Sequence, residues 1–280
     1  MKGVAAVALV AAFALAGTAA SAASAVDCAA PNALTAIAVS QRLPAARLAQ
    51  HEGLTIVAIG SSSTEGIGAS SPAASYPSRL EIELRRHYPE GNIRVLNRGI
   101  GGEDAPEELA RLDRTVGADH PDLVIWQVGT NAVLRRDDLA ADDHLIERGV
   151  ALLKGSGIDV VLMDLQYAPG VLARPAYAEM ETRIANIANG EHVGLFRRFA
   201  LMERWNETHQ LGDAAMIGTD GLHMTDASYA CLATDLADAL ARNWGAAGAF
   251  AAASSPAEKE RMAGLDRHRS APVATEHDRR

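Results

Sequence analysis

The sequence predicts an α/β domain with three layers (α/β/α), in which a five-stranded parallel sheet lies between two layers of helices. Short, continuous runs of apolar and β-branched residues are typical of strands buried on both faces, and residues 54–59 form such a run. These runs alternate with longer segments that mix apolar and charged residues, as crossover helices between parallel strands do. The composition, 48% hydrophobic and 22% charged, excludes a collagen-like or wholly disordered protein.

Each expected element follows from its local pattern. Strands are expected at residues 54–59, 93–96, 122–128, 158–165 and 192–196. Helices are expected at residues 76–88, 103–116, 138–154, 175–188 and 226–244. The first of these helices ends before Pro89, and the second carries acidic residues in its first turn, which the positive end of the helix dipole favours.

The N-terminus has the pattern of a secretory signal peptide. Lys2 precedes an apolar run from Val4 to Gly17, and small residues follow, with cleavage expected after Ala22 or Ala25. The run of about 14 residues is shorter than the roughly 20 that a spanning helix needs, so an uncleaved membrane anchor is the less favoured alternative. We therefore expect a signal peptide over residues 1–25, no stable membrane insertion after its cleavage, and a periplasmic or secreted protein.

The remaining chain divides into three parts. Residues 26–52 are interpreted as a lead-in segment, residues 53–245 as the folded domain, and residues 246–280 as a tail. The domain is long enough for one hydrophobic core. The tail mixes charges of both signs with almost no apolar periodicity, so it buries too little surface to offset its ordering entropy. We expect it to be disordered.

Charge and residue types exclude several functions. Asp and Glu number 35 against 26 Lys and Arg, without a basic cluster, so nucleic acid is not an expected partner. Two cysteines are too few for a four-cysteine zinc site, and the histidines lack metal-ligand spacing. The serine-rich loop after residue 60 has no lysine for phosphates, which argues against a nucleotide site. Neither a metal nor a cofactor is expected.

Four polar clusters follow predicted strands or precede the last helix. They are Ser61–Ser62–Ser63, the glycine-rich loop over residues 97–102, Gly129–Thr130–Asn131, and Asp220 with His223. The carboxyl ends of parallel strands share one sheet edge, so these clusters are expected to meet there. Singly, each has a structural explanation, such as a turn, tight backbone geometry or a helix cap. Together they supply a nucleophile, a base, a group that orients the base, and oxyanion donors.

From about residue 54 to 244 the sequence resembles the SGNH hydrolases, the superfamily of GDSL-like lipases and esterases. The family's Gly-Asp-Ser-Leu block matches Gly60-Ser61-Ser62-Ser63, and its Asn-x-Gly-x-x-Gly block matches residues 97–102. Its Gly-x-Asn-Asp block matches residues 129–132, and its Asp-x-x-His block matches residues 220–223. The resemblance implies the flavodoxin-like SGNH hydrolase fold and a catalytic set that comprises Ser62, Asp220 and His223.

Family members hydrolyse esters through an acyl-enzyme. By resemblance, His223 removes the Ser62 proton, Asp220 orients the imidazole, and an oxyanion hole is formed by the Ser62 and Gly102 N–H groups and the Asn131 amide. The expected function is an exported serine esterase (EC 3.1.1.-) acting on carboxylic esters of short acyl, O-acetyl glycan or lysophospholipid type. The alternative is a carbohydrate- or lipid-binding relative that retains the fold with little or no catalysis.

Several residues depart from the family pattern or lie beside it. Ser61 and Ala132 replace acidic residues of the first and third blocks, which removes two carboxylates that help to brace the site. Trp126 and Gln127, on the third strand, are interpreted as core packing rather than as substrate contacts.

The two cysteines, Cys28 and Cys231, are expected to form a disulfide if the protein is exported, because lone thiols commonly pair in an oxidising compartment. The alternative is a free thiol at Cys28 and a buried core residue at Cys231.

Overall fold

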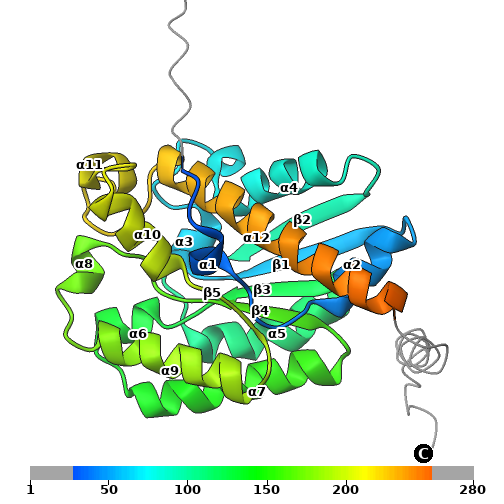
Figure 1. Ribbon diagram of the computed structural model, residues 1–280. Helices are drawn as coiled ribbons and strands as arrows, with labels where there is room; N and C mark the ends of the chain where they lie inside the picture. The colour runs from blue at the N-terminus through cyan, green and yellow to red at the C-terminus, as the bar shows by residue number, and fades with distance from the viewer. Residues whose placement is uncertain (1–27, 254–280) are drawn as a thin grey trace, which may run out of the picture.

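The computed structural model describes residues 28–253 (Figure 1). Its sheet comprises β1 (Leu54–Gly60), β2 (Ile93–Gly99), β3 (Leu123–Gln127), β4 (Asp159–Met163) and β5 (Gly194–Phe196). All neighbouring strands are parallel, in the order β2-β1-β3-β4-β5. The strand order reverses at β1, which lies between β2 and β3. In open α/β sheets the crevice at such a reversal is where ligands bind.

Two layers of helices cover the sheet, which confirms the three-layer fold expected from the sequence (Figure 1). In one layer α12 (Asp226–Ala253) packs against α4 (Tyr76–His87) and α2 (Arg42–Ala49). In the other, α7 (Leu139–Gly155) packs between α5 (Ala105–Asp119) and α9 (Tyr177–Gly190). The shorter helices are α1 (Asn32–Thr35), α3 (Ser62–Glu65), α6 (Thr130–Arg135), α8 (Pro169–Leu172), α10 (Arg198–Glu207), α11 (Asp213–Met216) and the 3-10 turn Pro72–Ala74.

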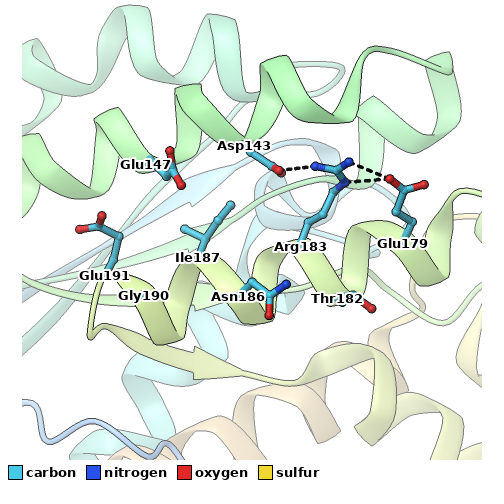
Figure 2. A pocket seen from close by; sticks show the side chains of 9 residues that line it. All are labelled: Asp143, Glu147, Glu179, Thr182, Arg183, Asn186, Ile187, Gly190 and Glu191. Atoms are coloured by element: carbon cyan, nitrogen blue, oxygen red, sulfur yellow. Dashed lines mark hydrogen bonds and ion pairs between the residues drawn. The ribbon is translucent and has the colours of Figure 1, made fainter.

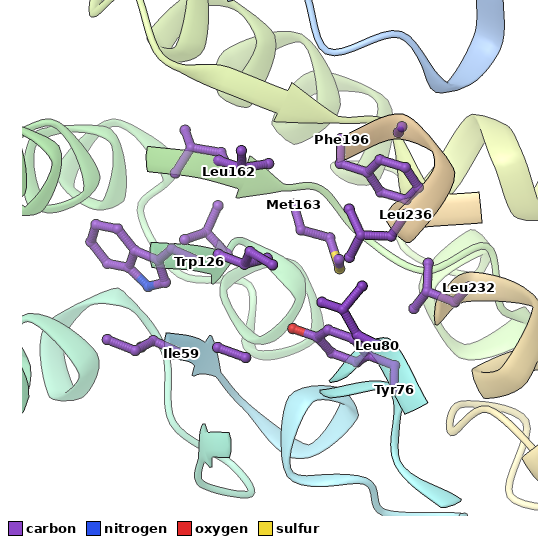
Figure 3. Packing of buried hydrophobic residues seen from close by; sticks show 14 of the residues in the cluster. Ile59, Tyr76, Leu80, Trp126, Leu162, Met163, Phe196, Leu232 and Leu236 are labelled. Carbon is purple, nitrogen blue, oxygen red and sulfur yellow. The ribbon is translucent and has the colours of Figure 1, made fainter. Parts of the chain in front are cut away.

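The core lies between the sheet and these layers. β1, β3 and β4 are apolar on both faces because both faces are covered. Figure 3 shows Tyr76 and Leu80 of α4 beside Leu232 and Leu236 of α12, around Met163 of β4. On the other side of the sheet, a side chain at position 149 would collide with the Trp126 indole at 2.2 Å, so glycine there lets α7 approach the sheet. Trp126 is fully buried, as expected.

The two ends of the domain differ most from the sequence-based expectation. The lead-in segment, residues 26–52, contains α1 and α2 within its described part. The last helix continues from the expected end at residue 244 to Ala253, because alanine has the highest helix propensity and dominates residues 246–253. The predicted tail therefore begins inside α12. The predicted signal peptide and residues 254–280 lie outside the described residues.

The segment before α2 is attached to α12. A disulfide joins Cys28 to Cys231 across 203 residues. The Asn243 side-chain amide donates hydrogen bonds to the Ile37 and Val39 carbonyls at 2.9 and 3.0 Å, and its oxygen accepts the Gln41 N–H at 2.8 Å. The segment is thus part of the packed domain. None of the helices within residues 28–253 has the length and apolar character that a membrane crossing requires.

Candidate active site

Ser62 is placed by a sharp turn at the carboxyl end of β1. The strand ends at Gly60, and α3 begins at Ser62. Gly60 has a φ of +155°, and a Cβ there would lie 2.4 Å from the Thr64 hydroxyl oxygen and 2.8 Å from Oε1 of Gln127. Glycine is therefore required at position 60, since any side chain would push α3 away from the strand.

The structure brings Ser62, His223 and Asp220 into one line of hydrogen bonds. His223 Nε2 lies 2.9 Å from Ser62 Oγ, and His223 Nδ1 lies 2.6 Å from Asp220 Oδ2. The other carboxylate oxygen of Asp220 accepts the backbone N–H groups of Leu222 and His223 at 2.9 and 3.0 Å. The Gly218 N–H donates to the His223 carbonyl at 2.8 Å and closes the loop. This is the arrangement of a hydrolytic triad.

The electrostatics of the pair fix its ionisation and the tautomer of the imidazole. Partial burial opposes ionisation of Asp220, but hydrogen bonds from the His223 ring and from the Leu222 and His223 N–H groups outweigh it and lower the pKa of Asp220 to about 2. An ionised carboxylate beside Nδ1 keeps the proton on that nitrogen. Nε2 is then the basic nitrogen, and it faces Ser62.

The three consecutive serines have different partners. Oε1 of Gln127 accepts both the N–H and the hydroxyl of Ser61 at 3.0 Å, and the hydroxyl of Ser63 at 3.1 Å. It also lies 3.3 Å from the Thr64 hydroxyl. Ser62 is the one serine of the three whose hydroxyl lies against His223 within the described structure. The geometry therefore favours Ser62 over its neighbours as the nucleophile.

Gln127 contacts the candidate site in a way that the sequence interpretation missed. It is buried, as expected for a core position, but its side-chain oxygen holds the turn that carries Ser62. The signal in the sequence was a lone amide at the end of an otherwise apolar strand. A buried amide needs hydrogen-bond partners, and the nearest polar loop in the parallel sheet is the one after β1.

Of the predicted oxyanion donors, Gly102 follows a glycine whose Cβ position would lie 3.9 Å from the Cβ of Ser62. Gly102 has a φ of +82°, and no atom lies within 4 Å of the position that a Cβ would occupy. Among residues 28–253, no hydrogen bond engages the N–H of Ser62 or of Gly102. The Asn131 amide donates one hydrogen bond to the Glu103 carbonyl at 2.6 Å, which leaves its second hydrogen for a substrate oxygen. Each of the three predicted donors therefore keeps an N–H hydrogen that has no protein acceptor among the described residues.

Glu65 braces the glycine-rich loop against the turn of Ser62. Its carboxylate accepts the Gly101 N–H at 2.6 Å, and its carbonyl accepts the Asn97 amide at 3.2 Å. A Cβ at position 99 would lie 2.1 Å from the Glu65 nitrogen, so the close contact between loop and helix requires glycine. Glu65 was not among the residues singled out from the sequence.

The two departures from the family blocks have different surroundings. Ser61 is buried and bonded to Gln127, so a neutral hydroxyl and an amide occupy the place of the usual carboxylate. Ala132 is fully buried in α6 and packs with the core.

Three buried acids lie around the helix that follows the glycine-rich loop. Asp104 caps the N-terminus of α5, with Glu107 completing a capping box, and Asp142 lies on the neighbouring α7. Burial raises the pKa of Asp104 to about 6, that of Asp142 to about 7 and that of Glu108 to about 8. Oδ2 atoms of Asp104 and Asp142 are buried without a hydrogen-bond partner. Burial thus shifts each of these acids toward its neutral form, because a buried charge is costly.

A separate groove runs between α7 and α9 and contains none of the predicted site residues (Figure 2). Its walls carry Asp143, Glu147, Glu179 and Glu191, and Arg183 bridges Asp143 and Glu179. Within residues 28–253, no cluster of three or more His, Cys, Asp or Glu side chains could hold a metal ion.

Comparison with known proteins finds a matching family of lipase-like proteins and relatives described as esterases. A model of the non-GDSL lipase-like family matches residues 27–246. An arylesterase of Vibrio mimicus is 29% identical over 150 residues, which are 53% of this chain and 70% of the relative. An acetylxylan esterase of Geobacillus stearothermophilus is 35% identical over 88 residues, which are 31% of this chain and 40% of the relative.

Solved structures share the fold. A two-domain esterase active on acetylated mannans has a TM-score of 0.63 at 19% identity, covering 75% of this chain and 56% of its own length. The structure of TesA has a TM-score of 0.58 at 23% identity, covering 68% of this chain and 99% of its own. The present chain thus corresponds to little more than half of the mannan-active protein.

Proposed function

The chain belongs to the non-GDSL lipase-like family within the SGNH hydrolase superfamily, a class of hydrolases that act on ester bonds, and we propose that it is an exported serine esterase. The observation that carries the proposal is the line of hydrogen bonds from Ser62 through His223 to Asp220. A protein that only binds carbohydrate or lipid has no need of a hydroxyl, an imidazole and a carboxylate in this alignment.

The proposed reaction begins when Ser62 Oγ attacks the ester carbonyl carbon while its proton moves to His223 Nε2. The tetrahedral oxyanion receives hydrogen bonds from the Ser62 and Gly102 N–H groups and from the Asn131 amide. Collapse breaks the bond to the alcohol oxygen, which takes the proton from Nε2 and leaves an acyl-Ser62. Water then attacks the acyl carbon and gives a proton to Nε2, and collapse returns that proton to Ser62 and releases the acid.

Export is supported by two separate observations. The N-terminus has the pattern of a cleaved signal peptide. The disulfide between Cys28 and Cys231 is typical of proteins that fold in an oxidising compartment.

The proposed substrates are carboxylic esters of small acyl groups, with O-acetyl glycans preferred over lysophospholipids. The preference comes from two relatives, one described as an acetylxylan esterase and one as active on acetylated mannans.

A fluorophosphonate probe tests the proposed nucleophile. The intact protein should take up one probe per chain, and mass spectrometry should place it on Ser62. Ser62→Ala should take up none, while Ser61→Ala and Ser63→Ala, which keep the nucleophile, should still be labelled. Modification of another serine, or no uptake between pH 6 and 9, would contradict the proposed mechanism. p-Nitrophenyl esters of rising chain length and acetylated xylan would then locate the substrate preference.

A further inference from the structure

Arg198 is a buried cation next to the proposed site that the mechanism does not use. It is the first residue of α10, directly after β5, and its side chain is fully buried. Its Nη1 donates a hydrogen bond to Ser63 Oγ at 2.8 Å, and its Nη2 donates to Gln166 Oε1 at 3.0 Å. One guanidinium therefore contacts residues that follow two different strands, β1 and β4.

Each contact leads to a residue adjacent to the proposed machinery. Ser63 follows Ser62 in the chain. Oε1 of Gln166 also accepts the hydroxyl of Thr130 at 3.1 Å, and Thr130 precedes Asn131. The guanidinium is thus linked through one side chain to the turn of the proposed nucleophile, and through two side chains to the start of α6, which carries Asn131.

Arg198 also fixes the direction of the hydrogen bonds that the Ser63 hydroxyl makes. A guanidinium has donors and no acceptor, so the Ser63 oxygen must accept the bond from Arg198. The Ser63 hydroxyl then donates its proton to Oε1 of Gln127, 3.1 Å away. Ser61 and Ser63 both donate to Oε1 of Gln127, so Gln127 and, through Ser63, Arg198 hold the turn that carries Ser62.

Fold stability alone does not account for this cation. Within the described residues, no carboxylate oxygen lies within the 4.0 Å of an ion pair with Arg198, and its Nε has no hydrogen-bond partner. Burial lowers its pKa, although Asp164, Tyr76 and other neighbouring groups oppose this at longer range. A buried charge without a direct counter-ion is costly, and an apolar side chain would avoid that cost. Such departures are expected at functional sites.

We propose that Arg198 is a positioning residue, which holds the Ser62 turn and the start of α6, with Asn131, in the relative geometry that the esterase reaction requires. The inference rests on the proposed function. Arg198 does not contact the reacting atoms and acts only through Ser63 and through Gln166 with Thr130.

The test compares Arg198→Met, of similar length and without charge, with the control Arg242→Met. Arg242 also donates to a threonine hydroxyl, Thr35, at 2.7 Å, but it does so between α12 and the N-terminal segment. Turnover of p-nitrophenyl acetate is divided by the number of sites titrated with the fluorophosphonate. We expect Arg198→Met to lose tenfold to a hundredfold in kcat per titrated site, with KM within threefold of the wild type, because charged hydrogen bonds are lost. Arg242→Met should keep its kcat.

A purely structural role would lower the number of titrated sites without changing kcat per site, and that result would overturn the proposal. If Arg198→Met does not fold, Ser63→Ala and Gln166→Leu each remove one acceptor and keep the cation. Each should lower kcat about threefold to tenfold, and two values within twofold of the wild type would overturn the proposal. A wild-type protein that neither hydrolyses esters nor takes up the probe would instead overturn the proposed function and this role with it.

Discussion

Removing the disulfide should lower stability by an amount that the chain connectivity predicts. The bridge closes a loop of 203 residues in the unfolded chain. Loop-closure entropy for this length corresponds to about 5 kcal/mol at 25 °C, an upper value because part of the effect is offset in real proteins. For a domain of this size, 5 kcal/mol corresponds to a fall in Tm of roughly 10–20 °C. The double variant Cys28→Ala/Cys231→Ala avoids placing a polar group at the buried Cys231.

Urea unfolding followed by tryptophan fluorescence measures this loss, because Trp126, Trp205 and Trp244 are all buried in the folded domain. We expect the double variant to lose roughly 3–5 kcal/mol of unfolding free energy. Reducing the wild type should produce the same loss, while the reductant should not affect the double variant. Turnover at 15 °C should stay within twofold of the wild type, since neither cysteine is one of the proposed site residues. A loss below about 1 kcal/mol would refute the entropic reasoning.

The remaining predictions concern the proposed machinery and the buried acids. Ser62→Ala and His223→Ala should each lose several orders of magnitude in turnover, and wild-type turnover of either variant would exclude its role. Asp220→Asn should lose less than His223→Ala, because the base remains and only its orientation and charge support are removed; an equal loss would contradict the division of roles. Asn131→Ala should reduce kcat on the order of a hundredfold, which steady-state kinetics can check. Asp142 has a pKa of about 7 against the usual 3.8, so its contribution to stability is complete below pH 4 and is lost as the pH rises to 7. Asp142→Asn should therefore raise the unfolding free energy at pH 8 by on the order of 2 kcal/mol and leave it nearly unchanged at pH 4; the same pH dependence in both proteins would contradict this assignment.

The sequence predicts the sheet well because strands buried on both faces have continuous apolar runs, as residues 54–59 illustrate. It does not predict how the N-terminal segment packs. That segment is held by its backbone N–H and carbonyl groups, which bond to Asn243 of α12, and backbone bonds of this kind leave no pattern in the residues that make them. The sequence also does not predict that α12 extends to Ala253, since a run of alanine and glycine is compatible with a linker as well as with a helix.

The residues of the candidate site also fall into those that the sequence predicts and those that it does not. Ser62, Asp220 and His223 can be assigned from motif spacing, because the chemistry demands those residue types at strand ends. Gln127 and Arg198 cannot, because their partners come from other strands and become neighbours only in the folded sheet. From the sequence alone, a charged residue after a short strand is expected at the surface. Arg198 is nevertheless fully buried, because α10 packs it against the rest of the domain.

The contact between the N-terminal segment and α12 has a consequence for the order of events during synthesis. The segment with Cys28 leaves the ribosome early, whereas Cys231 and Asn243, its partners on α12, are among the last residues of the domain to appear. Until then the segment has neither its covalent partner nor the amide that holds its backbone. Because the sequence contains two cysteines, no incorrect bridge can form within the chain during this interval. The two ends of the domain can therefore be joined only after all five strands between them have been synthesised.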